Sequence, residues 1–250
     1  MQTTRRSFLP ALLAAVAGRA LESGTPIPPS ARRTGWFSDP AMLAYDCGPD
    51  HPESPARLRA VDAALRAAAL ASLVRAGPMA DPLPHVQAVH TREHLEGLAQ
   101  ANAGGYRAAL VAAADVLGAA DAVCRGELTN AFCAVRPPGH HAANAGRPYG
   151  YCYVNHVAVA ANCCRKIHGL SRVLIVDWDY HHGDGTQALV EHTPGILYFS
   201  THNRRAFPGT GRSRNDDSVV SVHLGPGTHV RRYRTRLGGA PGTRCSRVAP

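Results

Sequence analysis

The sequence predicts an α/β domain whose mainly parallel sheet is flanked by helices. The apolar, β-branched run at 173–176 is typical of a strand buried on both faces. A helical pattern at 155–167, closed by Gly169, precedes that run and follows a second strand-like run at 131–135. A strand–helix–strand unit of this kind crosses over the sheet and pairs its two strands in parallel.

Most of the helices are expected in the first half of the chain. Ser54 is typical of an N-cap, and Gly77 is expected to end the helix that it starts. Thr91 is expected to cap a short helix. An Ala-rich segment at 106–125 predicts a third, longer helix.

The second half is expected to add strands and then to lose regular structure. Apolar runs at 196–200 and 219–223 predict two further strands. Residues 229–250 are rich in arginine, contain no acid, and show neither helical nor strand periodicity. We therefore expect an atypical basic tail over 229–250.

The composition predicts one domain with a sizeable core. The chain has 250 residues, of which 45% are hydrophobic. Its formal charge of +9 is concentrated at the two ends, since residues 1–20 carry three arginines, residues 231–250 carry six, and neither segment has an acid. The rest of the chain is electrically balanced, so its charge gives no argument for a nucleic-acid partner.

The N-terminus predicts export. Arg5 and Arg6 precede a short apolar run that ends in small residues, which is the form of a twin-arginine signal peptide over 1–20. Residues 21–33, with three prolines, are expected to be a linker. The apolar run is too short to cross a bilayer, so no stable membrane span is expected. We expect a periplasmic or otherwise exported protein, or a cytoplasmic one if the signal is not used.

Charged side chains gather where the strand at 173–176 ends. Asp177, Asp179 and His181 alternate along the chain, so they share one face where the strand passes into a loop. Open α/β sheets bind their ligands at the carboxyl ends of strands. Two carboxylates and an imidazole at this place form a metal-site pattern. A strand end followed by a solvated acidic turn is the alternative.

Two adjacent histidines, His140 and His141, are expected in a constrained loop, because two prolines and a glycine at 137–139 precede them. Such a pair can bind a metal or act as general acid and base. Asp177 and Asp184 are acids that could orient the two rings. A surface histidine pair without a role is the alternative.

The cysteines and the remaining histidines suggest less. The cysteines number seven and include no C-x-x-C pair, so neither a disulfide framework nor a structural zinc knot is expected. Cys152 leaves a cysteine nucleophile paired with His141 as an alternative to metal chemistry. His90 and His94 have the spacing of zinc ligands, but no carboxylate cluster accompanies them, so we expect core or surface roles.

These motifs resemble the zinc-dependent histone deacetylase family, in particular its branch of bacterial deacetylase-like amidohydrolases and acetylpolyamine amidohydrolases. The main resemblance is in Arg136-Pro-Pro-Gly-His-His-Ala142 and in the segment Asp177–Gly185. Further segments agree in order and spacing, at 51–58, 150–155 and 207–211. The resemblance implies a deacetylase-like domain at 34–228. It also implies a three-layer sandwich of the arginase/deacetylase type, incomplete at its C-terminal end.

The resemblance also implies ligands and substrate contacts. Asp179 and His181 would hold one zinc ion per chain. Gly150, Tyr151 and Phe207 would line a narrow tunnel for the substrate, with Gly150 acting through its carbonyl. A monovalent cation such as K⁺ would be held by five residues, Asp177, Asp179, His181, Ser200 and Thr201.

The implied reaction is hydrolysis of an acetylated amine, such as acetyl-lysine or an acetylpolyamine, to acetate and free amine. The zinc would polarise the acetamide carbonyl and lower the pKa of its bound water. His141, oriented by Asp184, would act as the general base on that water. His140, against Asp177, would stabilise the intermediate or protonate the leaving amine. For an exported protein, small acetylated amines are better suited as substrates than histones.

The chain departs from the family pattern in two respects. The family's third zinc ligand is an aspartate at a later strand end, whereas the acids after Asp184 are Glu191, Asp216 and Asp217, none of them at an expected strand end. The family's oxyanion-stabilising tyrosine lies in a later Gly-rich loop, and Tyr233 is not in such a loop. We therefore expect a missing third ligand, a truncated or frameshifted reading frame, and little or no turnover. A native basic tail is the alternative.

Two other functions remain open. An arginase-like hydrolase would use two manganese ions on the same broad fold, although the His140–His141 stretch and the aromatic Tyr151 favour a deacetylase. A non-catalytic remnant would show no activity with any added metal. The sequence leaves the oligomeric state and the acetylated substrate open.

Overall fold

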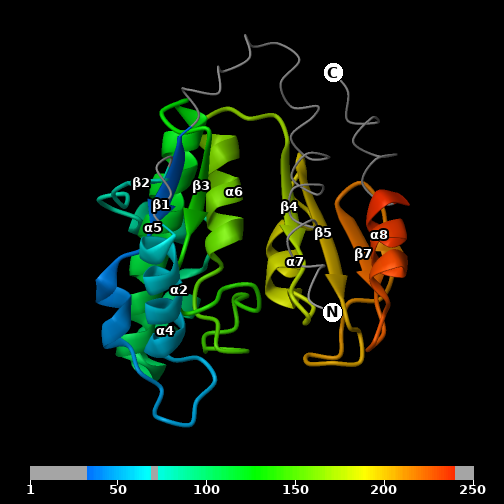
Figure 1. The fold of residues 1–250 in the computed structure, drawn as a ribbon, viewed down its shortest axis with the longest axis horizontal. Coiled ribbons are helices and arrows are strands. Elements are labelled where there is room, and N and C mark those ends of the chain that lie inside the picture. Colours follow the sequence, from blue (N-terminus) through cyan, green and yellow to red (C-terminus); the bar gives the residue numbers. More distant parts are fainter. Residues whose placement is uncertain (1–32, 69–72, 240–250) are drawn as a thin grey trace. The chain divides into compact units, whose positions relative to one another are not determined.

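The computed structural model describes residues 33–68 and 73–239, which alternate between strands and helices as expected of an α/β domain (Figure 1). The elements are β1 (Thr34–Phe37), the 3₁₀ helix η2 (Pro40–Ala44), α2 (Pro55–Ala67), β2 (Leu73–Arg75), α3 (Leu83–Gln87), α4 (Arg92–Ala101), α5 (Ala103–Cys124), β3 (Asn130–Cys133), α6 (His156–Lys166), β4 (Val173–Asp177), α7 (Asp184–Val190), β5 (Ile196–His202), β6 (Arg214–Asn215), β7 (Val219–His223) and α8 (Val230–Gly239). The predicted signal peptide at 1–20, the predicted linker up to residue 32, and the tail beyond 239 lie outside the described residues.

The strands form two hydrogen-bonded ladders. The first has the order β2-β1-β3 and is parallel throughout. The second has the order β4-β5-β7-β6, in which the short β6 runs antiparallel to β7 and the other pairs are parallel. Parallel pairing aligns Asp177 of β4 with Ser200 of β5, and His202 of β5 with His223 of β7. The carboxyl ends of these strands, with their polar side chains, therefore meet at one edge.

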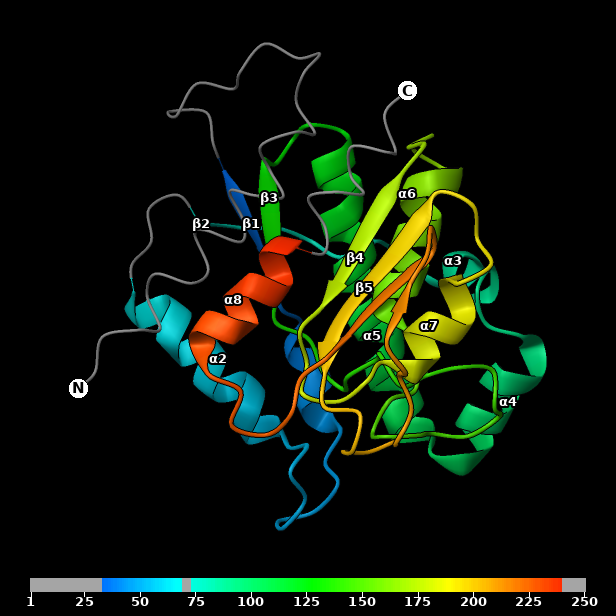
Figure 2. The ribbon, with the colours of Figure 1, turned by 90° about the vertical axis from the view of Figure 1, so that its right-hand side faces the viewer.

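Helices cover both faces of the second ladder. Ile196 and Tyr198 of β5 pack in one cluster with Ala158 of α6. On the other face of β5, the Thr201 hydroxyl hydrogen-bonds the Tyr233 hydroxyl of α8 at 3.0 Å. Helix α6 packs also against α5, which in turn packs against β1 and β3 (Figure 1 and Figure 2). The prediction of a mainly parallel sheet flanked by helices is confirmed, with the strands divided between two ladders.

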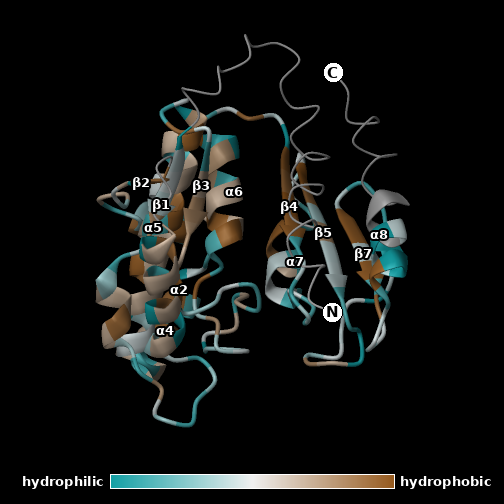
Figure 3. Cartoon of the chain, viewed as in Figure 1, coloured by the Kyte–Doolittle hydropathy of each residue, from teal (hydrophilic) through white to brown (hydrophobic). Residues whose placement is uncertain are grey.

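The apolar core follows the helix and strand periodicities. In α5 and α4, Leu117 and Leu98 are fully buried, and β7 begins with the buried Val219. β4 and β7 are among the most hydrophobic elements of the fold (Figure 3). Full burial of a side chain of this size contributes about 1.5–3 kcal/mol, so these side chains stabilise the elements that contain them. No helix within the described ranges combines the length and apolar character that crossing a membrane requires.

Two segments differ from the sequence prediction. The helix that begins at Pro55 ends at Ala67 instead of Gly77, and Leu73–Arg75 forms β2 by pairing with β1. Such a short strand is stabilised by the neighbouring strand, which local sequence preference does not encode. The expectation of irregular chain was also wrong at 230–239, where α8 forms.

Candidate active site

The carboxyl end of β4 places Asp177 in a hydrogen-bond network. Its Oδ2 accepts from His140 Nδ1 at 3.0 Å and from the Tyr198 hydroxyl at 2.9 Å, and its Oδ1 accepts from the Asp179 backbone N–H at 3.1 Å. Burial by itself raises the carboxyl pKa, but these hydrogen bonds and the charge of His140 outweigh burial and hold the pKa of Asp177 below its ordinary value. Asp177, with 12% of its side chain exposed, is therefore ionised at neutral pH.

The loop that carries the two histidines packs closely against α6. His156 Nε2 of α6 donates to the Pro137 carbonyl at 3.0 Å. Gly139 permits the approach, because a Cβ at that position would lie 2.6 Å from a backbone carbonyl oxygen of the following segment. The expected constrained loop is present, and it fixes the backbone of His140 and His141.

Each histidine of the pair has its own carboxylate. His141 is buried, and its Nδ1 lies 2.7 Å from Asp184 Oδ1 at the start of α7. The His140 and His141 ring centroids are 4.1 Å apart. Burial alone would lower the pKa of His140, but the hydrogen bond and charge of Asp177 outweigh it and raise that pKa above its ordinary value. Two adjacent imidazoles in different environments are suited to separate acid and base roles.

Asp179 and His181 lie at the exposed side of this cluster, with 50% and 42% of their side chains exposed. His181 Nδ1 is 3.1 Å from Asp179 Oδ1, and the same oxygen accepts from the His181 backbone N–H at 2.7 Å. A carboxylate oxygen and an imidazole nitrogen are both donors that zinc accepts. Within residues 33–68 and 73–239, no group of three or more His, Cys, Asp or Glu side chains is placed to hold a metal ion.

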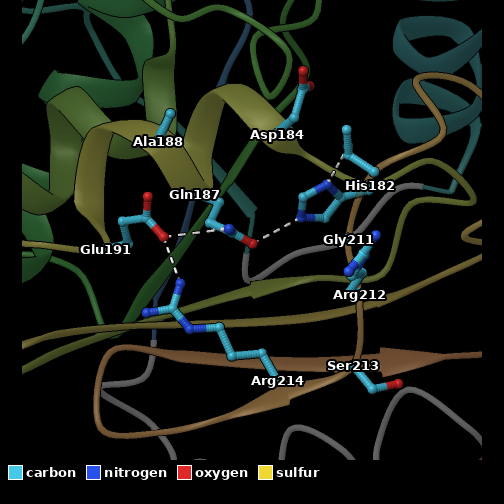
Figure 4. Close-up of a pocket in the computed structure, with 10 residues that line it drawn as sticks. His182, Asp184, Gln187, Ala188, Glu191, Gly211, Arg212, Ser213 and Arg214 are labelled. Carbon is cyan, nitrogen blue, oxygen red and sulfur yellow. Dashed lines mark hydrogen bonds and ion pairs between the residues drawn. The ribbon is translucent and has the colours of Figure 1, made fainter.

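A pocket of about 430 Å³ is lined by ten residues, which Figure 4 draws as sticks and which include Asp184. Gln187 donates to Glu191 Oε2 at 3.3 Å, and Arg214 binds the same oxygen at 2.6 Å. Arg214 also binds the carboxylate of Asp216. Two of the three acids that follow Asp184 are therefore ion-paired with one arginine.

Of the three expected substrate contacts, two lie against His141 and the third lies beside them at the surface. The Phe207 ring packs edge-on against His141, with 5.0 Å between centroids. Gly150 lies so close that a Cβ on it would be 2.3 Å from His141 Cδ2. Tyr151 is half exposed, has a φ of 65°, and packs its ring against His51 at 4.6 Å. Gly150 and Phe207 are thus in contact distance of His141, and Tyr151 stands beside them at the surface.

Two aromatic residues of the site were not singled out from the sequence. The Tyr149 ring lies 5.0 Å from Phe207, and Tyr198 donates to Asp177. Tyr198 could have been found, because it lies two positions before Ser200 on the same face of a strand. Tyr149 carries no such signal, since its position depends on a loop.

Parallel pairing brings the proposed monovalent-cation residues to one edge, but two of the side chains diverge. Ser200 Oγ lies 2.9 Å from His202 Nδ1, and Thr201 Oγ1 lies 3.0 Å from the Tyr233 hydroxyl. Consecutive residues of a strand point to opposite faces. The role of Ser200 and Thr201 in binding a cation stays a prediction.

The geometry of Cys152 argues against a cysteine nucleophile. Its Sγ donates to the Gly150 carbonyl and accepts from the His141 backbone N–H, both at 3.4 Å. Burial raises the pKa of the Cys152 thiol to about 12. The thiol therefore stays protonated at neutral pH, whereas a nucleophile needs the thiolate.

Comparison with known proteins gives several matches. Residues 51–239 match the histone deacetylase domain family. The match extends beyond residue 228 to the end of α8. The uncharacterised protein slr0245 of Synechocystis sp. is 38% identical over 215 residues, which cover 77% of this chain and 70% of that protein. A probable deacetylase of Archaeoglobus fulgidus is 34% identical over 220 residues, which cover 78% of this chain and 60% of that protein. The crystal structure of the HDA15 HD domain matches with a TM-score of 0.69 and 34% identity, over 77% of this chain and 62% of that chain.

Proposed function

The chain belongs to the histone deacetylase family, and from this premise we propose that it hydrolyses the amide bond of an acetylated amine to acetate and a free amine. The family match covers 51–239, and a relative with 34% identity is a probable deacetylase. The chain spans 60% of that relative's length. Activity and substrate are therefore proposals for this chain, and they depend on its own site. Because Asp179 and His181 are two of the three ligands that catalytic zinc usually takes, we expect turnover to be low.

The observation that carries the proposal is the pair of His–Asp contacts. His140 with Asp177 and His141 with Asp184 stand side by side, at 3.0 Å and 2.7 Å, and the two rings lie 4.1 Å apart. Amide hydrolysis needs one group to take a proton from water and another to protonate the departing amine. Two imidazoles that are oriented by separate carboxylates meet both needs.

The proton transfers follow from the ring nitrogens. His141 donates its Nδ1–H to Asp184, which leaves Nε2 free to accept a proton from the attacking water. His140 donates its Nδ1–H to Asp177, and this carboxylate stabilises the protonated ring, which raises the pKa of His140 above its ordinary value. A proton on His140 Nε2 can then pass to the nitrogen of the leaving amine, which departs neutral.

Zinc is the metal that we propose for this site. Asp179 and His181 supply an oxygen and a nitrogen donor 3.1 Å apart, and these donor types fit the ion. Catalytic zinc usually takes three protein ligands, so these two side chains form part of a donor set. When bound, zinc polarises the acyl carbonyl and lowers the pKa of water.

The proposed substrate class is an acetamide on a linear apolar stem, as in acetyl-lysine or an acetylated polyamine. Tyr151 and Phe207 are 49% and 45% exposed, and the Phe207 ring packs against His141. Exposed aromatic side chains suit contact with an alkyl chain. We also propose that the protein is exported, and that small acetylated amines are then the available substrates.

The test is to incubate the full chain with zinc and either an acetyl-lysine peptide or an N-acetylated polyamine, and to measure acetate release. Acetate release by the unsubstituted chain that is lost in His141→Ala supports the proposal. The same assay with arginine and manganese tests the arginase-like alternative through urea formation. No acetate from either substrate would overturn the proposal. Urea from arginine would then favour the arginase-like hydrolase, and neither product would favour a non-catalytic protein.

A further inference from the structure

A second pair of histidines, His90 and His94, lies outside the catalytic residues. His90 follows α3 and His94 belongs to α4, and both residues are 1% exposed. Their rings stack, with 4.8 Å between centroids and 29° between planes. Burial lowers the pKa of His90 to about 4 and also lowers that of His94. Both rings are therefore neutral at pH 7.

His90 bridges the two ends of one loop, residues 144–155. Its Nε2 accepts a hydrogen bond from the Asn155 backbone N–H at 3.0 Å. A backbone N–H can only donate, so the ring proton is on Nδ1. That proton is donated to Asn144 Oδ1 at 3.1 Å. Asn144 at the start of the loop and Asn155 at its end are thus held by one ring.

His94 bridges the same loop with the opposite tautomer. Its Nδ1 accepts from the Gly146 backbone N–H at 3.1 Å, so its proton is on Nε2 and is donated to the Tyr153 carbonyl at 3.0 Å. With His90, this engages all four ring nitrogens of the pair. No nitrogen lone pair remains for a metal, which is consistent with the expected core role despite the zinc-like spacing.

The middle of the loop is a tight turn. The backbones of Tyr149 and Cys152 exchange two hydrogen bonds, of 3.1 Å and 2.9 Å. Between them, Gly150 and Tyr151 have φ values of 53° and 65°, as type I′ turns require. A residue with a side chain, such as Tyr151, adopts this conformation only where its surroundings hold it.

The turn delivers its residues to the catalytic pair. Gly150 lies against the His141 ring, where a Cβ would be 2.3 Å from Cδ2. Cys152 accepts a hydrogen bond from the His141 backbone N–H at 3.4 Å. The position of the loop is therefore coupled directly to the proposed general base.

We propose that His90 and His94 are positioning residues, which as a neutral pair tie the start of the 144–155 loop to its end and so hold the Gly150–Tyr151 turn against His141. The bridges fix both ends of a segment that otherwise makes a strained turn at the surface, which removes the conformational freedom of its ends. The expected effect on catalysis rests on the proposed function. The hydrogen bonds from His90 and His94 to the loop do not depend on it.

The first test needs no variant. Long-range ¹H–¹⁵N NMR correlations on the full chain at pH 7 report the tautomer of each histidine ring. We expect a neutral ring with the proton on Nδ1 for His90 and on Nε2 for His94. A charged ring at either position, or the opposite tautomers, would overturn the proposal even if every variant failed to fold.

The second test compares two substitutions at each position by hydrogen exchange. Glutamine keeps one donor and one acceptor, whereas leucine keeps neither. We expect His90→Leu to speed exchange at the Asn155 amide, and His94→Leu at the Gly146 amide, by about tenfold or more. His90→Gln and His94→Gln are expected to restore part of the protection. Unchanged exchange in both leucine variants contradicts the bridges.

A core truncation controls for general loss of stability. Leu128 packs in a separate cluster with Phe37, Ala119 and Ala122, so Leu128→Ala is expected to weaken the whole fold without selective exposure of the loop amides. In the acetate assay, the leucine variants are expected to raise KM more than they lower kcat, and glutamine is expected to rescue KM. If the loop amides exchange selectively faster in the leucine variants but the unsubstituted chain releases no acetate, the hydrogen bonds of His90 and His94 are supported. Only the proposed function is then contradicted.

Discussion

Arg136 and Glu53, 83 residues apart in the sequence, form a buried ion pair. Arg136 Nη2 lies 2.6 Å from Glu53 Oε2 and Nε lies 2.9 Å from Oε1, so the guanidinium and the carboxylate meet through two parallel hydrogen bonds. The side chains are 4% and 1% exposed. Arg136 directly precedes the loop of His140, and Glu53 lies near His51, which contacts Tyr151. The pair thus joins two segments of the proposed site.

Removing one member of this pair is expected to lower the free energy of unfolding substantially. Arg136→Leu leaves the carboxylate of Glu53 buried without a counter-ion, which costs about 3–5 kcal/mol. The double variant Arg136→Leu/Glu53→Leu leaves no uncompensated charge, so we expect it to be more stable than Arg136→Leu alone. Urea denaturation followed by circular dichroism measures the three free energies of unfolding. A double variant less stable than Arg136→Leu would contradict this account.

Catalysis is expected to depend on the orientation of His141. Asp184→Asn removes the carboxylate that accepts the Nδ1–H, so the ring can adopt the wrong tautomer. We expect kcat to fall by about 10²–10⁴-fold in Asp184→Asn and in His141→Ala. The matched control is Glu96→Gln, since Glu96 is an exposed carboxylate that pairs with Arg92 within α4. Equal loss in the control, or full activity in Asp184→Asn, would remove Asp184 from the mechanism.

Metal binding is expected to need both exposed donors. Asp179→Ala and His181→Ala should each weaken zinc binding, because each removes one of two donors that lie 3.1 Å apart. Equilibrium dialysis with elemental analysis gives the stoichiometry and affinity, and the expected stoichiometry is one zinc per chain. His192→Ala, which removes a histidine with 87% of its side chain exposed, serves as the control. Two manganese ions per chain would favour the arginase-like alternative instead.

The sequence predicted the parts of the fold that local pattern determines. The apolar β-branched run became β4, and Asn155 caps α6, where its side chain accepts from the Ala158 N–H at 3.1 Å. The strand at 219–223 was predicted with its observed bounds. β2 and α8 were missed because their few apolar residues gain stability from contacts made elsewhere in the chain, as Tyr233 does with Thr201.

The residues of the candidate site were likewise predicted where a local motif marks them. The two motifs named His140, His141, Asp177 and Asp184, and the structure brings these four together. What the sequence could not give is the identity of partners from distant segments, because neither Glu53 with Arg136 nor His90 with the 144–155 loop is marked by spacing. Long-range pairs of this kind become visible only once strand register and loop packing are known.

Cys152 is expected to be dispensable for chemistry. Its thiol is fully buried and its pKa is raised to about 12 by that burial, so iodoacetamide at neutral pH should leave it unmodified. We expect Cys152→Ser to keep activity within about threefold, since a hydroxyl can still accept from the His141 backbone N–H as Cys152 Sγ does at 3.4 Å, whereas it removes the thiol. Peptide mass mapping and the acetate assay measure both outcomes. Inactivation that follows alkylation of Cys152 would revive the cysteine nucleophile.

The stability of the fold is expected to fall as the pH drops from about 6.5 to about 4. Burial lowers the pKa of His156 from 6.5 to about 4 in the folded state, so the unfolded chain binds a proton more readily across this range. The contribution of neutral His156 is fully present above pH 6.5. It is lost progressively as the pH falls towards 4, by up to about 3 kcal/mol. His90, whose pKa burial also lowers to about 4, adds to the same slope.

His156→Gln tests this assignment, because glutamine can donate to the Pro137 carbonyl as His156 Nε2 does at 3.0 Å but does not titrate. Urea unfolding at several pH values between 4 and 7 should give a shallower loss of stability in His156→Gln than in the unsubstituted chain. His192→Gln, at an exposed position, should leave the slope unchanged. If His156→Gln keeps the full slope, His156 is not the group whose protonation opposes folding. The carboxylates of the buried pairs would then have to account for the acid sensitivity.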